Sequence, residues 1–144
     1  MEEIKDLVEY GIMGLLGVLS VASFAIGIER LMTYSQMDLS QFSSLKSLEL
    51  ALTKRLHLLA VIGANAPYLG LLGTVLGIML TFYTIGQSSI ADTGQIMVGL
   101  ALAMKVTALG LVVAIPAVVM YSLLGRRVKT LMVTWEENYE RKEV

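Results

Sequence analysis

Few side chains in the apolar parts of this sequence could carry a charge or a proton. Between residues 58 and 125 the titratable groups are Asp92, Lys105 and the phenols of Tyr68, Tyr83 and Tyr121. A phenol titrates too high to exchange protons near neutrality. A lysine would first have to lose its charge. Because an ionisable residue inside a membrane is a functional candidate by default, Lys105 is a candidate intramembrane charge site. No carboxylate lies mid-way along either apolar run. Either the chain does not conduct protons, or a partner protein supplies the acidic side chain.

The same inventory excludes several other kinds of chemistry. The chain has no Cys and a single His, His57, so a thiolate or zinc site lacks ligands. No Asp–His–Ser or paired-carboxylate arrangement appears around His57, which lies at the edge of an apolar run. The formal net charge of −1 leaves no basic surface for nucleic acid. We expect no catalytic residues, no metal, no cofactor and no nucleic-acid partner.

The elements that must position these groups are membrane helices. Hydrophobic residues make up 56% of the 144 residues and charged residues only 16%, against about 25% charged in a soluble domain. Three segments can cross a hydrocarbon core of about 30 Å: residues 10–28, 58–86 and 96–124. The second and third would be about 43 Å long as helices, so we expect tilt or extension beyond the bilayer into the cytoplasm. The sequence predicts an all-α membrane protein with three transmembrane helices.

The basic residues predict the orientation of these spans. Segment 29–57 carries Arg30, Lys46, Lys54 and Arg55, and the tail 125–144 carries Arg126, Arg127, Lys129, Arg141 and Lys142. The connection 87–95 carries none, and residues 1–9 carry only Lys5. Because basic loops stay in the cytoplasm, we predict cytoplasmic 29–57 and 125–144, and periplasmic 1–9 and 87–95. The acidic start is unlike the basic end of a signal peptide, so we expect the first span to be retained.

Both predicted cytoplasmic segments have the pattern of an amphipathic helix. Asp38-Leu39-Ser40-Gln41 fits a capping box at the start of the first. An apolar stripe follows it: Phe42, Leu45, Leu48, Leu52 and Leu56. The tail has a similar stripe: Val128, Leu131, Met132, Trp135 and Tyr139. These stripes can pack on each other, lie on the membrane or pack between subunits. We expect the last, because a small chain with long helices has little else to bury against.

Glycines and prolines are concentrated in the second and third spans. Gly73 and Gly77 form a small-xxx-small pair, and with Gly70 and Gly110 they would let two backbones approach closely. Pro67 and Pro116 each lack an N–H and clash with the carbonyl four residues earlier, so a kink and a freed carbonyl are expected at each. The two spans should pack tightly.

Two runs in these spans resemble the signatures of one family. Ala66-Pro67-x-Leu69-Gly70-Leu71-Leu72-Gly73-Thr74-Val75-x-Gly77 resembles the second-span signature of the MotA/TolQ/ExbB proton channel family. The second run resembles the third-span signature of the same family and reads Ala101-Leu102-x-x-x-x-Thr107-Ala108-x-Gly110-Leu111-x-Val113-Ala114-Ile115-Pro116-Ala117. With three spans in order, the resemblance covers essentially the whole chain. It is strongest for the ExbB branch in a short form. The TolQ branch is similar, whereas the MotA branch has four spans and a larger cytoplasmic portion.

The resemblance implies a bacterial inner-membrane motor subunit. Such chains form a ring, typically a pentamer, in which the second and third spans line the lumen and the first packs outside. The ring encloses single-span ExbD-like helices with an intramembrane Asp and, with a TonB-like protein, couples inward proton flow to outer-membrane nutrient uptake. By this resemblance Thr74 and Thr107 line the proton path. Family members often carry Glu five residues before the third-span Thr. This chain has Leu102 there and Lys105 three residues on, so no role of that Glu is transferred.

Three alternatives are kept open. The first is a TolQ-like subunit of an envelope-maintenance motor. The second is a membrane scaffold without transport, in which the hydroxyls of Thr74 and Thr107 bond to nearby backbone carbonyls. The third is an intramembrane enzyme, for which no constellation of residues is found. For Lys105, the functional interpretation is a fixed cation facing protein or water, and the alternative is a side chain whose amine reaches the membrane surface.

Overall fold

The computed structural model describes residues 2–87 and 92–143, and these residues form a wholly helical chain. Its elements are α1 (Glu2–Gln36), the 3₁₀ turn η1 (Leu39–Gln41), α2 (Leu45–Thr53), α3 (Leu56–Gln87) and α4 (Thr93–Glu143). α1, α3 and α4 are each long and apolar enough to cross a membrane. The predicted all-α architecture with three membrane-spanning helices is confirmed. Of the predicted segments 1–9, 87–95 and 125–144, residues 1, 88–91 and 144 lie outside the described part.

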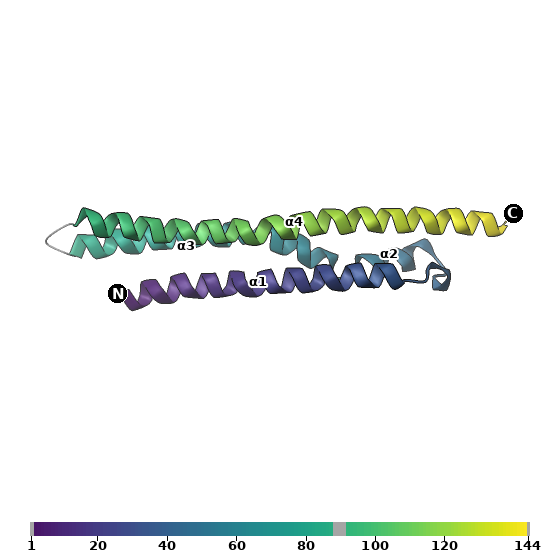
Figure 1. Cartoon of the computed structure of the whole chain (residues 1–144), viewed down its shortest axis with the longest axis horizontal. Helices are drawn as coiled ribbons and strands as arrows, with labels where there is room; N and C mark the ends of the chain where they lie inside the picture. Colours follow the sequence, from purple (N-terminus) through teal and green to yellow (C-terminus); the bar gives the residue numbers. More distant parts are fainter. Residues whose placement is uncertain (1, 88–91, 144) are drawn as a thin grey trace.

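The helices form one elongated bundle. α3 and α4 form an antiparallel hairpin and make the most extensive contact in the bundle, while α1 runs beside both (Figure 1). We call the end where α3 and α4 are joined the hairpin end, and the end with the C-terminus the tail end. Toward the tail end α4 extends past the other helices, and α2 and η1 pack against it (Figure 1).

Two of the long helices continue past the boundaries expected for the spans. The third span and the tail form a single helix of 51 residues, since nothing near Gly125 breaks it. α1 is 35 residues long and includes both the polar start of the chain and Glu29 to Gln36. The ends of α1 and α4 therefore do not coincide with the expected ends of the spans.

In the link between α1 and α3, the helix α2 begins later than the sequence predicts. The Asp38 carboxylate accepts a hydrogen bond from the Ser40 backbone N–H at 3.0 Å, but it caps only η1. This bond and one from the Ser40 hydroxyl hold the pKa of the Asp38 carboxyl below its usual range. α2 begins after Ser44, whose hydroxyl accepts from the Ser47 N–H at 3.2 Å. The predicted capping box at Asp38 is therefore wrong for α2. Arg55, with a φ of 63°, separates α2 from α3.

The two apolar stripes pack on each other within one chain. Leu48, Leu52 and Leu56 are buried in a core with Val128. Partly buried side chains surround this core, among them Phe42, Leu131, Met132 and Trp135. The expectation that the stripes pack between subunits is wrong for these residues, because α4 is continuous and presents the tail stripe directly to α2. A separate core lies in the bundle around Leu16, Ala66, Val106 and Ala114.

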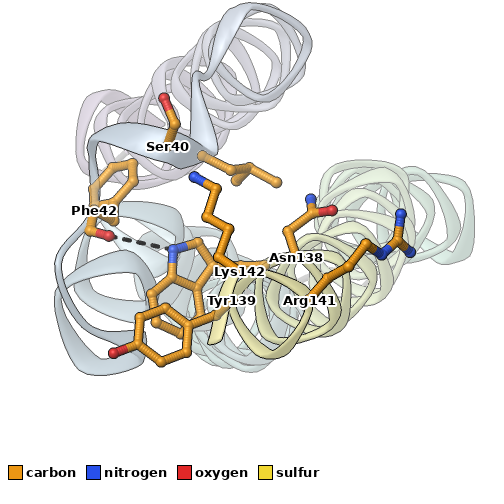
Figure 2. Close-up of a pocket in the computed structure, with 8 residues that line it drawn as sticks. Ser40, Phe42, Asn138, Tyr139, Arg141 and Lys142 are labelled. Carbon is orange, nitrogen blue, oxygen red and sulfur yellow. Dashed lines mark hydrogen bonds between the residues drawn. The ribbon is translucent and has the colours of Figure 1, made fainter. Parts of the chain in front are cut away.

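At the tail end this packing leaves a hollow of about 460 Å³, shown in Figure 2. The Trp135 indole N–H donates to the Phe42 carbonyl at 3.3 Å, which ties α4 to the link. The rings of Trp135 and Tyr139 stack with centroids 5.1 Å apart. Arg141 and Lys142 also line the hollow. The contacts of Trp135 fix the outer part of α4 against η1 and α2.

On both α1 and α4, charged residues stand at the two ends of a long uncharged stretch. α1 has no charged residue between Glu9 and Glu29, and α4 has none between Lys105 and Arg126. Either stretch is about 30 Å long as a helix, which equals the thickness of a hydrocarbon core. We call the part of the bundle between these two levels of charge the charge-free slab.

Contacts between the helices keep the two stretches in register. Near the tail end, a Cβ added at Gly27 would lie 2.5 Å from Met120 Sδ. Near the hairpin end, a Cβ added at Gly73 would lie 2.5 Å from Val106 Cγ1 and 3.4 Å from Ile12 Cδ1. The surplus length of α3 therefore lies on the hairpin side of the slab, where the hairpin extends past the start of α1 (Figure 1).

Candidate functional site

Glycines bring the backbones of α3 and α4 into contact. A Cβ added at Gly110 would lie 2.7 Å from the Ala66 carbonyl oxygen and 3.0 Å from Gly70 Cα. One added at Gly70 would lie 3.0 Å from Thr107 Cα. Because these obstacles are backbone atoms, no side-chain rotation relieves them. The predicted packing residues Gly70 and Gly110 thus lie at one crossing point.

Further glycines extend the contact toward the hairpin end. Gly73 faces Val106, and a Cβ at Gly77 would lie 2.8 Å from Ala103 Cβ. Gly99, which is not among the predicted packing residues, lies against Thr81 in the same way. A Cβ added at Gly99 would lie 2.7 Å from the Thr81 hydroxyl. Its signal in the sequence was a glycine four residues before Ala103 on α4. Both α3 and α4 continue as helices through Pro67 and Pro116, so neither proline ends its helix.

The close approach places two hydroxyls across the helix interface. The side chains of Thr74 on α3 and Thr107 on α4 are hydrogen-bonded to each other. The Thr74 hydroxyl also lies 2.9 Å from the Ala103 carbonyl oxygen, and the Thr107 hydroxyl lies 3.1 Å from the Gly70 carbonyl oxygen. We call Thr74 and Thr107 the hydroxyl pair. The missing side chain at Gly70 is what lets Thr107 reach that carbonyl.

The hydroxyl pair can donate its hydrogen bonds in two directions. Each hydroxyl has one proton, so two donations are made at a time. Either Thr74 donates to Thr107 and Thr107 to the Gly70 carbonyl, or Thr107 donates to Thr74 and Thr74 to the Ala103 carbonyl. Rotation of both hydroxyls converts one arrangement into the other. The pair is half-buried, so it can also exchange a hydrogen bond with a group outside the chain.

Lys105 lies on a different surface from the hydroxyl pair. It is exposed, and among the described residues no carboxylate lies within 4.0 Å of its amine. It stands at the hairpin-side level of the charge-free slab.

A second polar site lies between α1 and the hairpin. Lys5 and Glu9 of α1 face Gly77 and Ala103 across a void of about 10 Å³. Toward the hairpin end a hollow of about 640 Å³ follows, and Lys5, Asp6, Asp92 and Gln95 are among its lining residues. Leu102, which stands where the family often has Glu, also lines this hollow. Lys5 and Glu9 are not predicted as site residues from the sequence, because residues 1–9 are expected to form a terminus outside the spans. Their spacing of one helical turn next to an uncharged run was the available signal.

Comparisons with known proteins identify the family of this chain. Residues 29–137 match the MotA/TolQ/ExbB proton channel family. The chain belongs to the MotA/TolQ/ExbB proton channel family. It is 54% identical over 136 residues to the biopolymer transport protein ExbB of Aquifex aeolicus, covering 94% of this chain and 92% of that protein. It is 53% identical over 132 residues to a putative ExbB-like biopolymer transport protein of Helicobacter pylori, covering 92% and 88%.

A longer relative matches over a smaller region. The ExbB protein of Salmonella typhimurium is 45% identical over 76 residues, which are 53% of this chain and 31% of that protein. The predicted resemblance to ExbB is confirmed. The chain is an ExbB-like, multi-pass membrane protein of a transport family.

Proposed function

We propose that this chain is the ring-forming subunit of a motor driven by the proton-motive force. In the proposed assembly, copies of the chain form a ring, a pentamer as in the family resemblance, in the bacterial inner membrane. The hairpin end faces the periplasm and the tail end the cytoplasm, as the basic residues predict. An ExbD-like helix stands in the ring, and a TonB-like protein transmits the work to outer-membrane nutrient receptors.

The observation that carries this proposal is the hydroxyl pair. Thr74 and Thr107 lie at the motif positions of the family, and their hydroxyls meet across α3 and α4. Within a membrane, paired hydroxyls can orient water or bond a carboxyl group. Neither α3 nor the part of α4 in the charge-free slab contains Asp or Glu. The group that takes protons onward from this pair within the slab is therefore the carboxyl group of a partner helix.

Exposed apolar surface supports assembly with other chains. Large apolar side chains of both hairpin helices are more than 50% exposed, including Val75 and Met79 on α3 and Val112 and Ile115 on α4. In a membrane these side chains contact lipid or neighbouring helices. A ring of hairpins would place one face of each against its neighbour and leave the hydroxyl pair near the enclosed partner.

A scaffold without transport is the second candidate, and one observation favours it. Both hydroxyls have backbone acceptors within their own chain, Ala103 for Thr74 and Gly70 for Thr107. Such bonds alone would make the pair a link between helices. A TolQ-like motor is the third, and the relatives named ExbB favour the nutrient-uptake role over it.

Proton flux in proteoliposomes separates these candidates. The chain is reconstituted alone, with its ExbD-like partner, and with that partner's intramembrane Asp changed to Asn. We expect flux driven by about 100 mV, worth about 2.3 kcal/mol per proton, only with the unchanged partner. Equal flux from the chain alone would place the carrier in this protein. No flux from any preparation whose complex is intact by native mass spectrometry would favour the scaffold.

A further inference from the structure

The void between α1 and the hairpin is lined by two charged side chains of α1, by small residues of the hairpin, and by the apolar side chains of Val8, Leu80 and Val106. Lys5 and Glu9 contribute from α1, and Gly73, Gly77 and Ala103 contribute from the hairpin. Its volume of about 10 Å³ has room for one water molecule, which needs polar partners to be stable there. The glycines create this space because any side chain at Gly77 would meet Ala103.

The two charged groups at the void are not held by partners. Glu9 and Lys5 are both half-buried. Among the described residues neither forms an ion pair or a hydrogen bond with another side chain. Glu29, at the other end of α1, contrasts with them, since it accepts from Arg30 at 2.8 Å and from Arg55 at 2.6 Å. The Glu9 carboxylate thus lines a water-sized void without a side-chain partner among the described residues.

The void lies between the outer hollow and the hydroxyl pair. Lys5 lines both the void and the hollow, so a single side chain borders the two spaces. Ala103 lines the void, and its carbonyl oxygen lies 2.9 Å from the Thr74 hydroxyl. Ile12, one helical turn further along α1 than Glu9, is level with Gly73. Glu9 is therefore about one turn closer to the hairpin end than the hydroxyl pair.

We propose that Glu9 is a proton relay that connects the outer hollow with the hydroxyl pair. A water in the hollow gives a proton to the Glu9 carboxylate, which forms an O–H bond. The Glu9 carboxyl then gives that proton to water in the void. The water passes a proton to the Thr74 hydroxyl as Thr74 donates its own to Thr107, and Thr107 donates its own to the carboxylate of the partner helix, which becomes a carboxylic acid. Glu9 returns to the carboxylate. Lys5, Asp6 and Asp92 are the other charged groups facing this route, and Lys5 balances the negative charge once the proton has left. The inference rests on the proposed function and adds to it a titratable group of this chain.

The test is proton flux through the reconstituted complex with its ExbD-like partner. We expect Glu9→Gln, which keeps the shape and removes the titratable group, to lower flux at least tenfold. Glu3→Gln is the matched control, because Glu3 is an exposed carboxylate on the same helix that lines neither space, and it should change flux less than twofold. Glu9→Asp should keep most of the flux. Native mass spectrometry checks that each complex is intact.

A second variant keeps the proposal testable if Glu9→Gln does not assemble. Glu9→His keeps a titratable group, so we expect flux with a pH profile shifted upward by about two pH units, as the ordinary pKa values of the two residues differ. An unshifted profile, or wild-type flux in Glu9→Gln, would overturn the relay and show that Glu9 only marks the membrane edge. Absence of partner-dependent flux in the wild-type complex would instead contradict the proposed function itself.

Discussion

At the scale of single residues, the hydroxyl pair depends on the close packing of α3 and α4. Thr74 and Thr107 meet only because Gly70 and Gly110 let the two backbones touch. Each hydroxyl can be a donor to a backbone carbonyl or to the other hydroxyl. The sequence motif located both threonines. It could not show that they contact each other, since that depends on the register between two helices.

Replacement of these threonines by valine separates transport from assembly. Valine keeps the side-chain shape and removes the hydroxyl, so Thr107→Val and Thr74→Val should leave the complex assembled. We expect each to lower uptake driven by the proton-motive force at least tenfold. The double variant should be no worse than the more severe single one, because the pair acts as a unit. Thr33→Val is the control, since that hydroxyl donates to the Glu29 backbone carbonyl oxygen of its own helix, at 2.8 Å. Normal uptake in both single variants would show that the hydroxyls only link the helices.

Lys105 belongs to the same scale, and its position changes what is expected of it. A lysine at the centre of a span costs about 2.5–3.5 kcal/mol on insertion scales, which is why the sequence favours a protein or water environment. The structure places it at the level of Glu9, at the edge of the charge-free slab, where the amine can reach the headgroups. We expect Lys105→Met to keep uptake within twofold of wild type. A tenfold loss that Lys105→Arg restores would instead establish a functional cation at this position.

At the scale of elements, composition predicts the spans but not their relative heights. Three uncharged runs are sufficient to locate α1, α3 and α4, and the glycine pattern identifies the α3–α4 contact. The placement of Glu9 beside Gly77 is not predictable in this way, because it requires knowing where α1 packs along the hairpin. The sequence also does not show that α2 begins at Leu45, after the cap at Ser44, and the reason is local. Asp38 offers an equally good cap, but it is used by η1.

The α3–α4 contact can be tested with one added methyl group. Gly110→Ala puts a Cβ within 2.7 Å of the Ala66 carbonyl oxygen, and forcing the helices apart should cost about 1–3 kcal/mol. Gly125→Ala, on the same helix, meets nothing within 4 Å and should be neutral or slightly stabilising because alanine favours helix. Thermal unfolding of the detergent-solubilised complex should show a lower midpoint for Gly110→Ala alone. Equal midpoints for the two variants would mean that the helices do not meet at Gly110.

At the scale of the whole molecule, the bundle is longer than the membrane it crosses. The tail end of α4 is held by the Trp135 contacts and the core shared with α2, so it forms a rigid extension on one side. On the other side the hairpin extends past the charges of α1. The hydroxyl pair therefore lies close to the hairpin-end face of the slab, and a long uncharged stretch of α4 follows it toward the tail end. Under the proposed function, a proton entering at the hairpin end would travel a short way before it reached the pair.

Cysteine labelling can locate the slab and the orientation together, because the chain has no native Cys. Met104 and Ile115 are 65% and 61% exposed on α4, but only Met104 lies at the slab edge. Ile115 is about 15 Å deeper. In intact cells stripped of the outer membrane, a maleimide that cannot cross the membrane should label Met104→Cys and not Ile115→Cys. Thr130→Cys, beyond the other edge, should react only after the membrane is opened. Labelling of Ile115→Cys as fast as Met104→Cys would place water along that face of α4. Labelling of Thr130→Cys from outside would reverse the orientation, and with it the side from which protons reach Glu9.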